Sequence, residues 1–127
     1  MKLYLAAAFE RQLEMSLYKW QLTAFGHEVV SRWHDPAERH RSLADATTIV
    51  ELERWASEDV TGVKAAEVVA SFTGHGTRGG RHVEFGLALG LGKQLLIIGP
   101  KENVFHYLPG VEHFTMPDEF LKWAECG

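Results

Sequence analysis

Apolar residues along this chain fall into two alternating patterns, short continuous runs and longer stretches with helical spacing. The short runs have the length and the branched or aromatic content of strands. The predicted strands cover residues 2–8, 27–33, 65–72, 93–100 and 112–116, and the last of them is the weakest. The run KQLLIIGP is apolar throughout its centre, which is typical of a strand buried on both faces of a parallel sheet.

Helical spacing marks the stretches between these runs. In the segment 11–25, four apolar side chains recur on one face, at Leu13, Leu17, Trp20 and Ala24, and a glycine follows at the usual cap position. A weaker helical pattern covers 43–56, and Ser57 is placed to cap a further short turn over 58–64. Further helical segments are predicted from about residue 80 to 92, over 102–108, and over 117–125 with a proline at its start.

Strands that alternate with helices predict a parallel sheet covered by helices on both faces. The expected fold class is therefore α/β, a flavodoxin-like or Rossmann-like sandwich with about five strands. The chain has 127 residues and no visible repeat, so we predict a single domain over 1–127. Ligands of such folds bind beyond the carboxyl ends of the strands, where the strand order reverses. We therefore expect a site in the loops after Leu5, Phe72 and Ile98.

Composition and charge argue against several function classes. Apolar residues make up 46% of the chain and charged residues 24%, as in ordinary globular proteins. The net charge is −4 and the basic residues are scattered, so we expect no nucleic-acid partner. Glu10 and Arg11 interrupt the apolar start too early for a signal peptide or a membrane span. Cys126 is the only cysteine, so we expect no disulfide and a cytoplasmic location.

The sequence shows no pattern typical of a metal site or of a catalytic serine or cysteine triad. The chain has 7 histidines, but none forms a pair at helical ligand spacing with an acid placed for zinc. No G-x-S-x-G motif occurs, and Cys126 lies at the end of the sequence. We expect neither a metal site nor a cofactor.

A glycine-rich loop follows the third predicted strand. Gly74, Gly76 and Gly79 have the G-x-G-x-x-G spacing that brings backbone close to a pyrophosphate at the start of a helix. The loop follows the third strand rather than the first, and the nearest downstream acid, Glu102, comes after another strand. The motif alone is a weak sign of dinucleotide binding. A non-catalytic nucleotide-binding module that uses this loop stays as the alternative function.

Glu84 is the only polar side chain in the run VEFGLALGLG. On a helix that begins near Gly80, it shares a face with Leu87, Ala88 and Leu91. A buried carboxylate without a partner is costly, and the positive end of its own helix favours the ionised form. This combination suits a nucleophile. A partly exposed glutamate paired with a neighbour such as Arg81 is the structural alternative.

Three segments, read together, carry a family resemblance. They are LYLAAAF at 3–9, EDVTGVKAAEVVAS at 58–71 and GGRHVEFGLALGLGK at 79–93. Their order and motifs resemble the nucleoside 2-deoxyribosyltransferases and the related deoxynucleoside monophosphate N-glycosidases. The most specific piece is a glycine, three residues, then E-x-G and an apolar helix ending in GK. The resemblance implies an enzyme of nucleotide salvage that cleaves or transfers at the N-glycosidic bond of 2′-deoxyribonucleosides or their 5′-monophosphates.

The same resemblance implies roles for individual residues. Glu84 would attack the anomeric carbon of the deoxyribose and hold a covalent glycosyl intermediate, and Tyr4 would orient it. A carboxylate nucleophile divides a difficult substitution into two easier steps, as in retaining glycosidases. The substrate-binding positions implied by the match are Phe9, Asp59, Glu67, Gly79, Gly80, Arg81 and His82. The family usually has the shorter aspartate where this chain has Glu67.

Two loops depart from the family pattern. The transferases carry an acid shortly before the nucleophile, whereas this loop offers His75, Thr77, Arg78 and Arg81, which would suit a 5′-phosphate. The first loop, AAAFERQ, lacks the glycine and serine residues with which the monophosphate hydrolases bind phosphate. The sequence therefore leaves open whether the substrate is a nucleoside or a nucleotide. It also leaves open whether the reaction is transfer or hydrolysis. The resemblance also implies a homo-oligomer, a dimer or a larger assembly.

Overall fold

A five-stranded, all-parallel sheet forms the centre of the protein. The computed structural model describes residues 1–38, 48–75 and 79–127. The strand order is β2-β1-β3-β4-β5, and each neighbouring pair is parallel. The strands are β1 (Lys2–Ala6), β2 (Glu28–Val29), β3 (Val68–Phe72), β4 (Gln94–Ile98) and β5 (Val111–Phe114). The predicted α/β class with a parallel sheet is confirmed.

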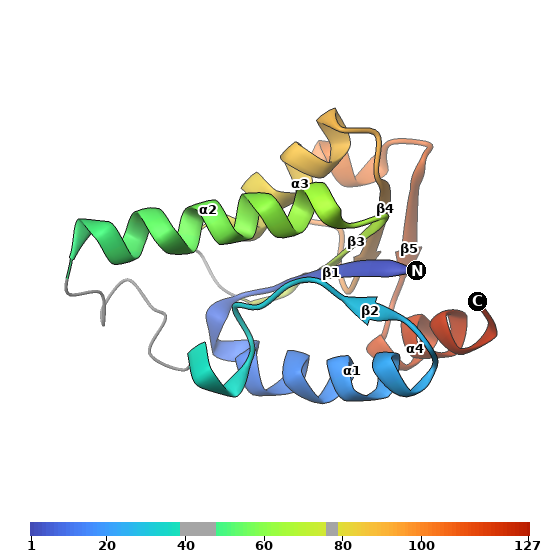
Figure 1. Ribbon diagram of the computed structural model, residues 1–127. Coiled ribbons are helices and arrows are strands. Elements are labelled where there is room, and N and C mark those ends of the chain that lie inside the picture. The colour runs from blue at the N-terminus through green and yellow to red at the C-terminus, as the bar shows by residue number, and fades with distance from the viewer. Residues whose placement is uncertain (39–47, 76–78) are drawn as a thin grey trace.

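Helices cover both faces of the sheet (Figure 1). On one face lie α2 (Ile49–Ala65) and α3 (Gly80–Gly90), and on the other lie α1 (Gln12–Ala24) and α4 (Pro117–Cys126). Short 3-10 turns occur at η1 (Phe9–Arg11), η2 (Pro36–Glu38) and η3 (Val104–Tyr107). The predicted helices near 11–25, 80–92 and 117–125 are confirmed to within two residues at each end, and the predicted turn over 102–108 is the shorter η3.

The second predicted helix and the turn after it are one continuous element. α2 runs from Ile49 to Ala65, so Ser57 lies inside the helix and is not a cap. Thr48 is the N-cap, because its side chain accepts a hydrogen bond from the backbone N–H of Glu51. The first part of the predicted segment, residues 43–47, lies outside the described residues.

β2 is much shorter than the predicted strand over 27–33. Backbone pairing with β1 ends near the bond from Val30 N to the carbonyl of Leu3 (2.8 Å). Beyond it, side chains replace the ladder: Ser31 Oγ accepts from Leu5 N (3.0 Å), and the Trp33 indole donates to Leu5 O (2.8 Å). The segment still holds β1 in place, but through hydrogen bonds that periodicity does not reveal.

α1 faces the sheet with a different row of side chains from the predicted one. Leu13, Leu17 and Trp20 are 75%, 61% and 83% exposed, while Met15 and Leu22 are fully buried. The helix carries two apolar rows, and the shape of the core selects the second of them. The row picked out by spacing alone therefore lies on the surface.

His34 is a buried neutral base that supports the β2 segment. It is fully buried, and its Nε2 lies 2.7 Å from Ser31 Oγ, the same hydroxyl that accepts from β1. The hydroxyl of Ser16 donates to the His34 carbonyl. Burial lowers the pKa of His34 from an ordinary 6.5 to about 4, although nearby Asp35 opposes this shift. His34 is thus neutral in the folded protein near neutral pH.

We expect this histidine to make folding sensitive to mild acid. A pKa that is lower in the folded than in the unfolded state gives stability that is complete above pH 6.5 and is lost as the pH falls toward 4. The free energy of unfolding should fall by up to about 3 kcal/mol over this window. Urea unfolding at pH 7.5 and 4.5 measures it. A His34→Gln variant should lose this part of the pH dependence, and an unchanged slope would contradict the assignment.

Candidate active site

Tyr4 and Glu84 form the centre of the candidate site. Tyr4 lies in the middle of β1, is fully buried, and its phenol O–H donates a hydrogen bond to Glu84 Oε2. Glu84 lies early in α3 and is half-buried. β1 and β3 are neighbours, but the chain leaves β1 toward α1 on one face and β3 toward α3 on the other. The hydrogen bond between Tyr4 and Glu84 therefore joins β1 to α3 at the point where the strand order reverses.

Close packing under α2 fixes the ring of Tyr4. Strand alternation directs Tyr4 toward α2 and α3, while Leu3 and Leu5 face the other layer. Gly62 of α2 lies against the ring: a Cβ at this position would be 2.9 Å from Tyr4 Cε2 and 3.3 Å from the carbonyl oxygen of Val30. Only glycine allows α2 to lie this close to β1. Sequence reasoning did not single out Gly62.

Glycines also shape the start of α3. Gly79 is the N-cap with φ +83°, and Gly74 has φ +100°, backbone conformations that other residues rarely adopt. α3 begins at Gly80, as predicted. Residues 76–78, which include part of the G-x-G-x-x-G motif, lie outside the described residues.

The face of α3 that carries Glu84 lies at the boundary between core and solvent. Ala88 is buried, Leu87 is half-buried, and Leu91 is 45% exposed. The face is less buried than its apolar pattern predicts. Glu84 thus combines apolar neighbours, a phenol donor and the positive end of its own helix.

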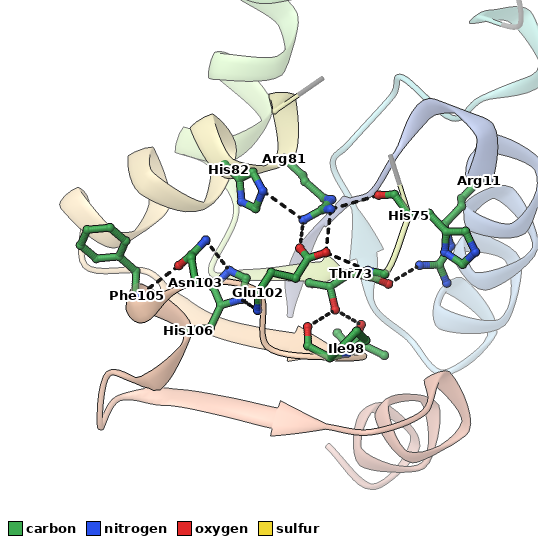
Figure 2. Close-up of polar contacts among 12 residues, drawn as sticks. Arg11, Thr73, His75, Arg81, His82, Ile98, Glu102, Asn103, Phe105 and His106 are labelled. Atoms are coloured by element: carbon green, nitrogen blue, oxygen red, sulfur yellow. Dashed lines mark hydrogen bonds and ion pairs between the residues drawn. The ribbon is translucent and has the colours of Figure 1, made fainter. Parts of the chain in front are cut away.

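Arg81 and Glu102 form a second polar cluster beside the start of α3 (Figure 2). The two Nη atoms of Arg81 donate to the two carboxylate oxygens of Glu102, and Nη2 also donates to the carbonyl of His75 at 3.0 Å. The backbone N–H of Gly74 donates to Glu102 Oε2 at 3.2 Å. Burial by itself raises the pKa of Glu102, but the bonds from Arg81 and Gly74 outweigh it and hold this pKa below its usual range. These hydrogen bonds of Arg81 thus go to Glu102 and the loop, rather than to Glu84.

His82 lies on the η3 side of α3. It is exposed, its Nε2 is 3.4 Å from Arg81 Nη1, and its ring centroid lies 6.1 Å from that of His106 (Figure 2). His106 is buried against Phe85, and its Nδ1 accepts from the backbone N–H of Glu102 at 3.0 Å. Burial lowers the pKa of His106. The structure therefore groups His82 with the Arg81–Glu102 cluster.

A second arginine near this edge is also paired. Arg11 donates from Nε and Nη2 to the two carboxylate oxygens of Glu14, at 2.7 Å each, and from Nη1 to the carbonyl of Thr73 at 3.1 Å. The bond from Arg11 is the main cause that lowers the pKa of Glu14, and a hydrogen bond from Tyr18 adds to it while burial opposes it. Both guanidinium groups are thus neutralised by carboxylates of the chain.

The other residues implied by the resemblance lie at different places. Asp59 is half-buried on α2, and Phe9 is half-buried at the start of η1, where it packs against the core. Glu67 immediately precedes β3, so it lies at the amino edge of the sheet, where its Oε1 accepts from Lys2 N at 2.8 Å. The structure therefore does not bring Glu67 to the edge where the loop of Gly79 and Gly80 lies.

A pocket of about 350 Å³ opens between α2 and the β2 segment. Its lining residues are Val30, Arg32, Arg54, Ser57, Glu58, Thr61, Gly62 and Ala65. Gly62 connects this pocket to the Tyr4 ring, but neither Tyr4 nor Glu84 lines it. The pocket thus adjoins the candidate site without containing its reactive pair.

In residues 1–38, 48–75 and 79–127, no helix has both the length and the apolar content needed to cross a membrane. Over the same ranges, no group of three or more histidine, cysteine, aspartate or glutamate side chains is arranged to hold a metal ion.

Comparisons with known proteins find relatives by structure only. No family model matches the sequence, and no curated protein matches it. A 2-deoxyribosyltransferase from Bacillus psychrosaccharolyticus is similar over 95% of this chain and 90% of its own, with a TM-score of 0.73 and 21% identity. A CMP N-glycosidase from Clostridium botulinum is similar over 100% of both chains, with a TM-score of 0.66 and 18% identity. This chain therefore has the fold of a 2-deoxyribosyltransferase and of a CMP N-glycosidase, in agreement with the family that its motifs resemble.

Proposed function

We propose that this protein cleaves or transfers at the N-glycosidic bond of 2′-deoxyribonucleosides or their 5′-monophosphates. Glu84 is the nucleophile, and Tyr4 is the residue that orients it. The observation that carries the proposal is the hydrogen bond from the Tyr4 phenol to Glu84, made at the switch point between β1 and β3. These two residues are 80 positions apart in sequence, and the fold brings them together.

The chemistry proceeds in two balanced steps. An oxygen of the Glu84 carboxylate bonds to C1′ of the sugar while the bond from C1′ to the base nitrogen breaks, and the base leaves with the electron pair and takes up a proton from solvent. Water or a second base then attacks C1′ and releases a proton to solvent, while the bond from C1′ to the carboxylate oxygen breaks and the carboxylate leaves with the electron pair. A phenol that holds Oε2 fixes the rotation of the carboxylate and so directs Oε1.

The surroundings of the pair support this role. Apolar neighbours raise the reactivity of a carboxylate by limiting its hydration, and Glu84 lies close to the start of α3, the end of a helix that attracts negative charge. The two structural relatives, a deoxyribosyltransferase and an N-glycosidase, act on the same kind of bond. We propose Asp59, Phe9, Gly79 and Gly80 as substrate contacts. A homo-oligomer stays a prediction, as does a cytoplasmic location.

A substrate panel tests the function directly. The purified protein is incubated with 2′-deoxyribonucleosides and their 5′-monophosphates, with and without a free acceptor base, and released base is followed by chromatography. Base release without an acceptor indicates hydrolysis, and a new nucleoside in its presence indicates transfer. No turnover across the panel, together with measurable binding, would favour the non-catalytic nucleotide-binding module.

Tyr4→Phe should lower kcat by about 10- to 100-fold, because a hydrogen bond to a charged group contributes about 1.5–3 kcal/mol. The ring stays, so its packing against Gly62 and the KM should change little. Steady-state kinetics on the best substrate of the panel measures the effect. Tyr18→Phe is the matched control, because the Tyr18 phenol donates to Glu14, and it should keep the wild-type kcat. Equal kcat values for both variants would remove Tyr4 from the mechanism.

A further inference from the structure

The carboxylate of Glu102 occupies an anion-binding arrangement built by the chain itself. Both Nη atoms of Arg81 and the N–H of Gly74 donate to its two oxygens, beside the N-terminus of α3 (Figure 2). A guanidinium, a loop amide and a helix start are the groups with which proteins bind phosphate. Here the guanidinium of Arg81 and the amide of Gly74 both donate to an internal carboxylate.

We propose that Glu102 is a specificity-determining residue that fills the anion position beside α3 and restricts the substrate to nucleosides without a 5′-phosphate. The inference rests on the proposed function and selects between the two substrate forms that it leaves open. It reverses the expectation, drawn from the basic loop, that Arg81 favours a phosphate.

Burial and charge make Glu102 an effective barrier. Its partner Arg81 has a side chain that is only 6% exposed, so the guanidinium cannot turn to solvent and serve a second anion. Arg11, which also lies at this edge, is held by Glu14. A phosphate that approached this position would meet the negative charge of Glu102, and like charges brought together at a binding surface strongly disfavour association.

The position is close to the reacting group. Arg81 precedes Glu84 by one turn of α3, and Gly74 follows β3, whose neighbour β1 carries Tyr4. In a deoxyribonucleoside the 5′ oxygen is only a few bonds from C1′. A nucleoside whose C1′ faces Glu84 therefore has its 5′ end close to this carboxylate. Among the described residues, Arg81 and Gly74 supply anion-binding groups beside α3, and both donate to Glu102.

Selectivity measurements test the proposal. We compare kcat/KM for base release from a 2′-deoxyribonucleoside and from its 5′-monophosphate, at fixed ionic strength, with the wild-type chain and three variants. Glu102→Gln keeps the shape of the side chain but leaves Arg81 unneutralised. The double variant with Arg81→Gln and Glu102→Gln removes both charges. Glu112→Gln, at an exposed carboxylate on β5, is the control for net charge.

The expected result is a wild-type preference for the nucleoside of about 100-fold or more. Glu102→Gln should raise the relative kcat/KM for the monophosphate at least about tenfold, the double variant should lose this gain, and Glu112→Gln should keep the wild-type ratio. A wild-type protein that uses the monophosphate as well as the nucleoside overturns the proposal, whether or not the variants fold. The proposal is also overturned if the Glu102→Gln variant is folded, as judged by circular dichroism, and keeps the wild-type ratio of the two kcat/KM values.

Failure of the proposed function gives a different result. If the wild-type chain cleaves neither compound, the glycosidic activity is wrong, and calorimetric binding of the same two compounds then tests Glu102 by itself. Tighter binding of the nucleoside, with a monophosphate gain in Glu102→Gln, supports the role of Glu102. Equal binding of the two compounds, or binding of neither, overturns it.

Discussion

Glu84→Gln should lower kcat for base release by about 10⁴-fold or more, because it removes the nucleophile and leaves no group to hold the sugar. The amide oxygen can still accept the Tyr4 hydrogen bond, so the fold and the ligand Kd should change little. Single-turnover assays measure the rate, and calorimetry with the unreacted substrate measures binding. A loss of rate without a loss of binding is the result that separates an enzyme from a binding module.

The matched control for this variant is Glu67→Gln. Glu67 is an exposed glutamate at the amino edge of β3, where it accepts a hydrogen bond from Lys2, and it lies outside the proposed site. The same change of charge at this position should leave kcat at the wild-type value. If Glu84→Gln keeps kcat within about tenfold of the wild type, Glu84 is not the nucleophile and the reaction needs another group.

Local sequence signals were sufficient for the sheet and for the start of α3. Continuous apolar runs predicted strands β1, β3 and β4, because a parallel strand is buried on both faces and needs no polar alternation. Glycines at 79 and 80 marked the start of α3, and the backbone at Gly79 has the positive φ that favours glycine. The meeting of Tyr4 and Glu84 was expected from the resemblance and not from spacing. Their hydrogen bond is a product of the parallel topology.

Features that depend on distant partners were not predictable in this way. The apolar row of Leu13, Leu17 and Trp20 has ideal helical spacing, but the sheet accepts the row with Met15 and Leu22. Periodicity gives the faces of a helix without saying which of them meets the core.

The pairing of Arg81 with Glu102 depends on where the loop after β4 lies, and sequence distance does not give this position. Glu67 matched a family position in sequence, but the strand boundary places it at the opposite edge of the sheet.

Gly62→Val should lower kcat by about 100-fold or more and reduce the free energy of unfolding by about 3 kcal/mol. A Cβ at this position would already lie 2.9 Å from Tyr4 Cε2 and 3.3 Å from the Val30 carbonyl, and a branched side chain adds two more carbons. The Tyr4 ring is fully buried, so it has no open space into which it can shift without disturbing the core. A displaced phenol no longer holds Glu84, and activity therefore falls more than the loss of stability alone explains.

Gly90→Val is the matched control, since Gly90 also lies in a helix but a Cβ there meets nothing within 4 Å. Valine and glycine differ by only a few tenths of a kcal/mol in helix propensity, so this variant should unfold and react almost as the wild type does. Thermal unfolding and steady-state kinetics of the two variants, measured at a temperature where both are folded, separate displacement of Tyr4 from a general effect of valine in a helix. A Gly62→Val variant with wild-type kcat would show that the position of the Tyr4 ring, and the contact with α2 that sets it, does not matter to the reaction.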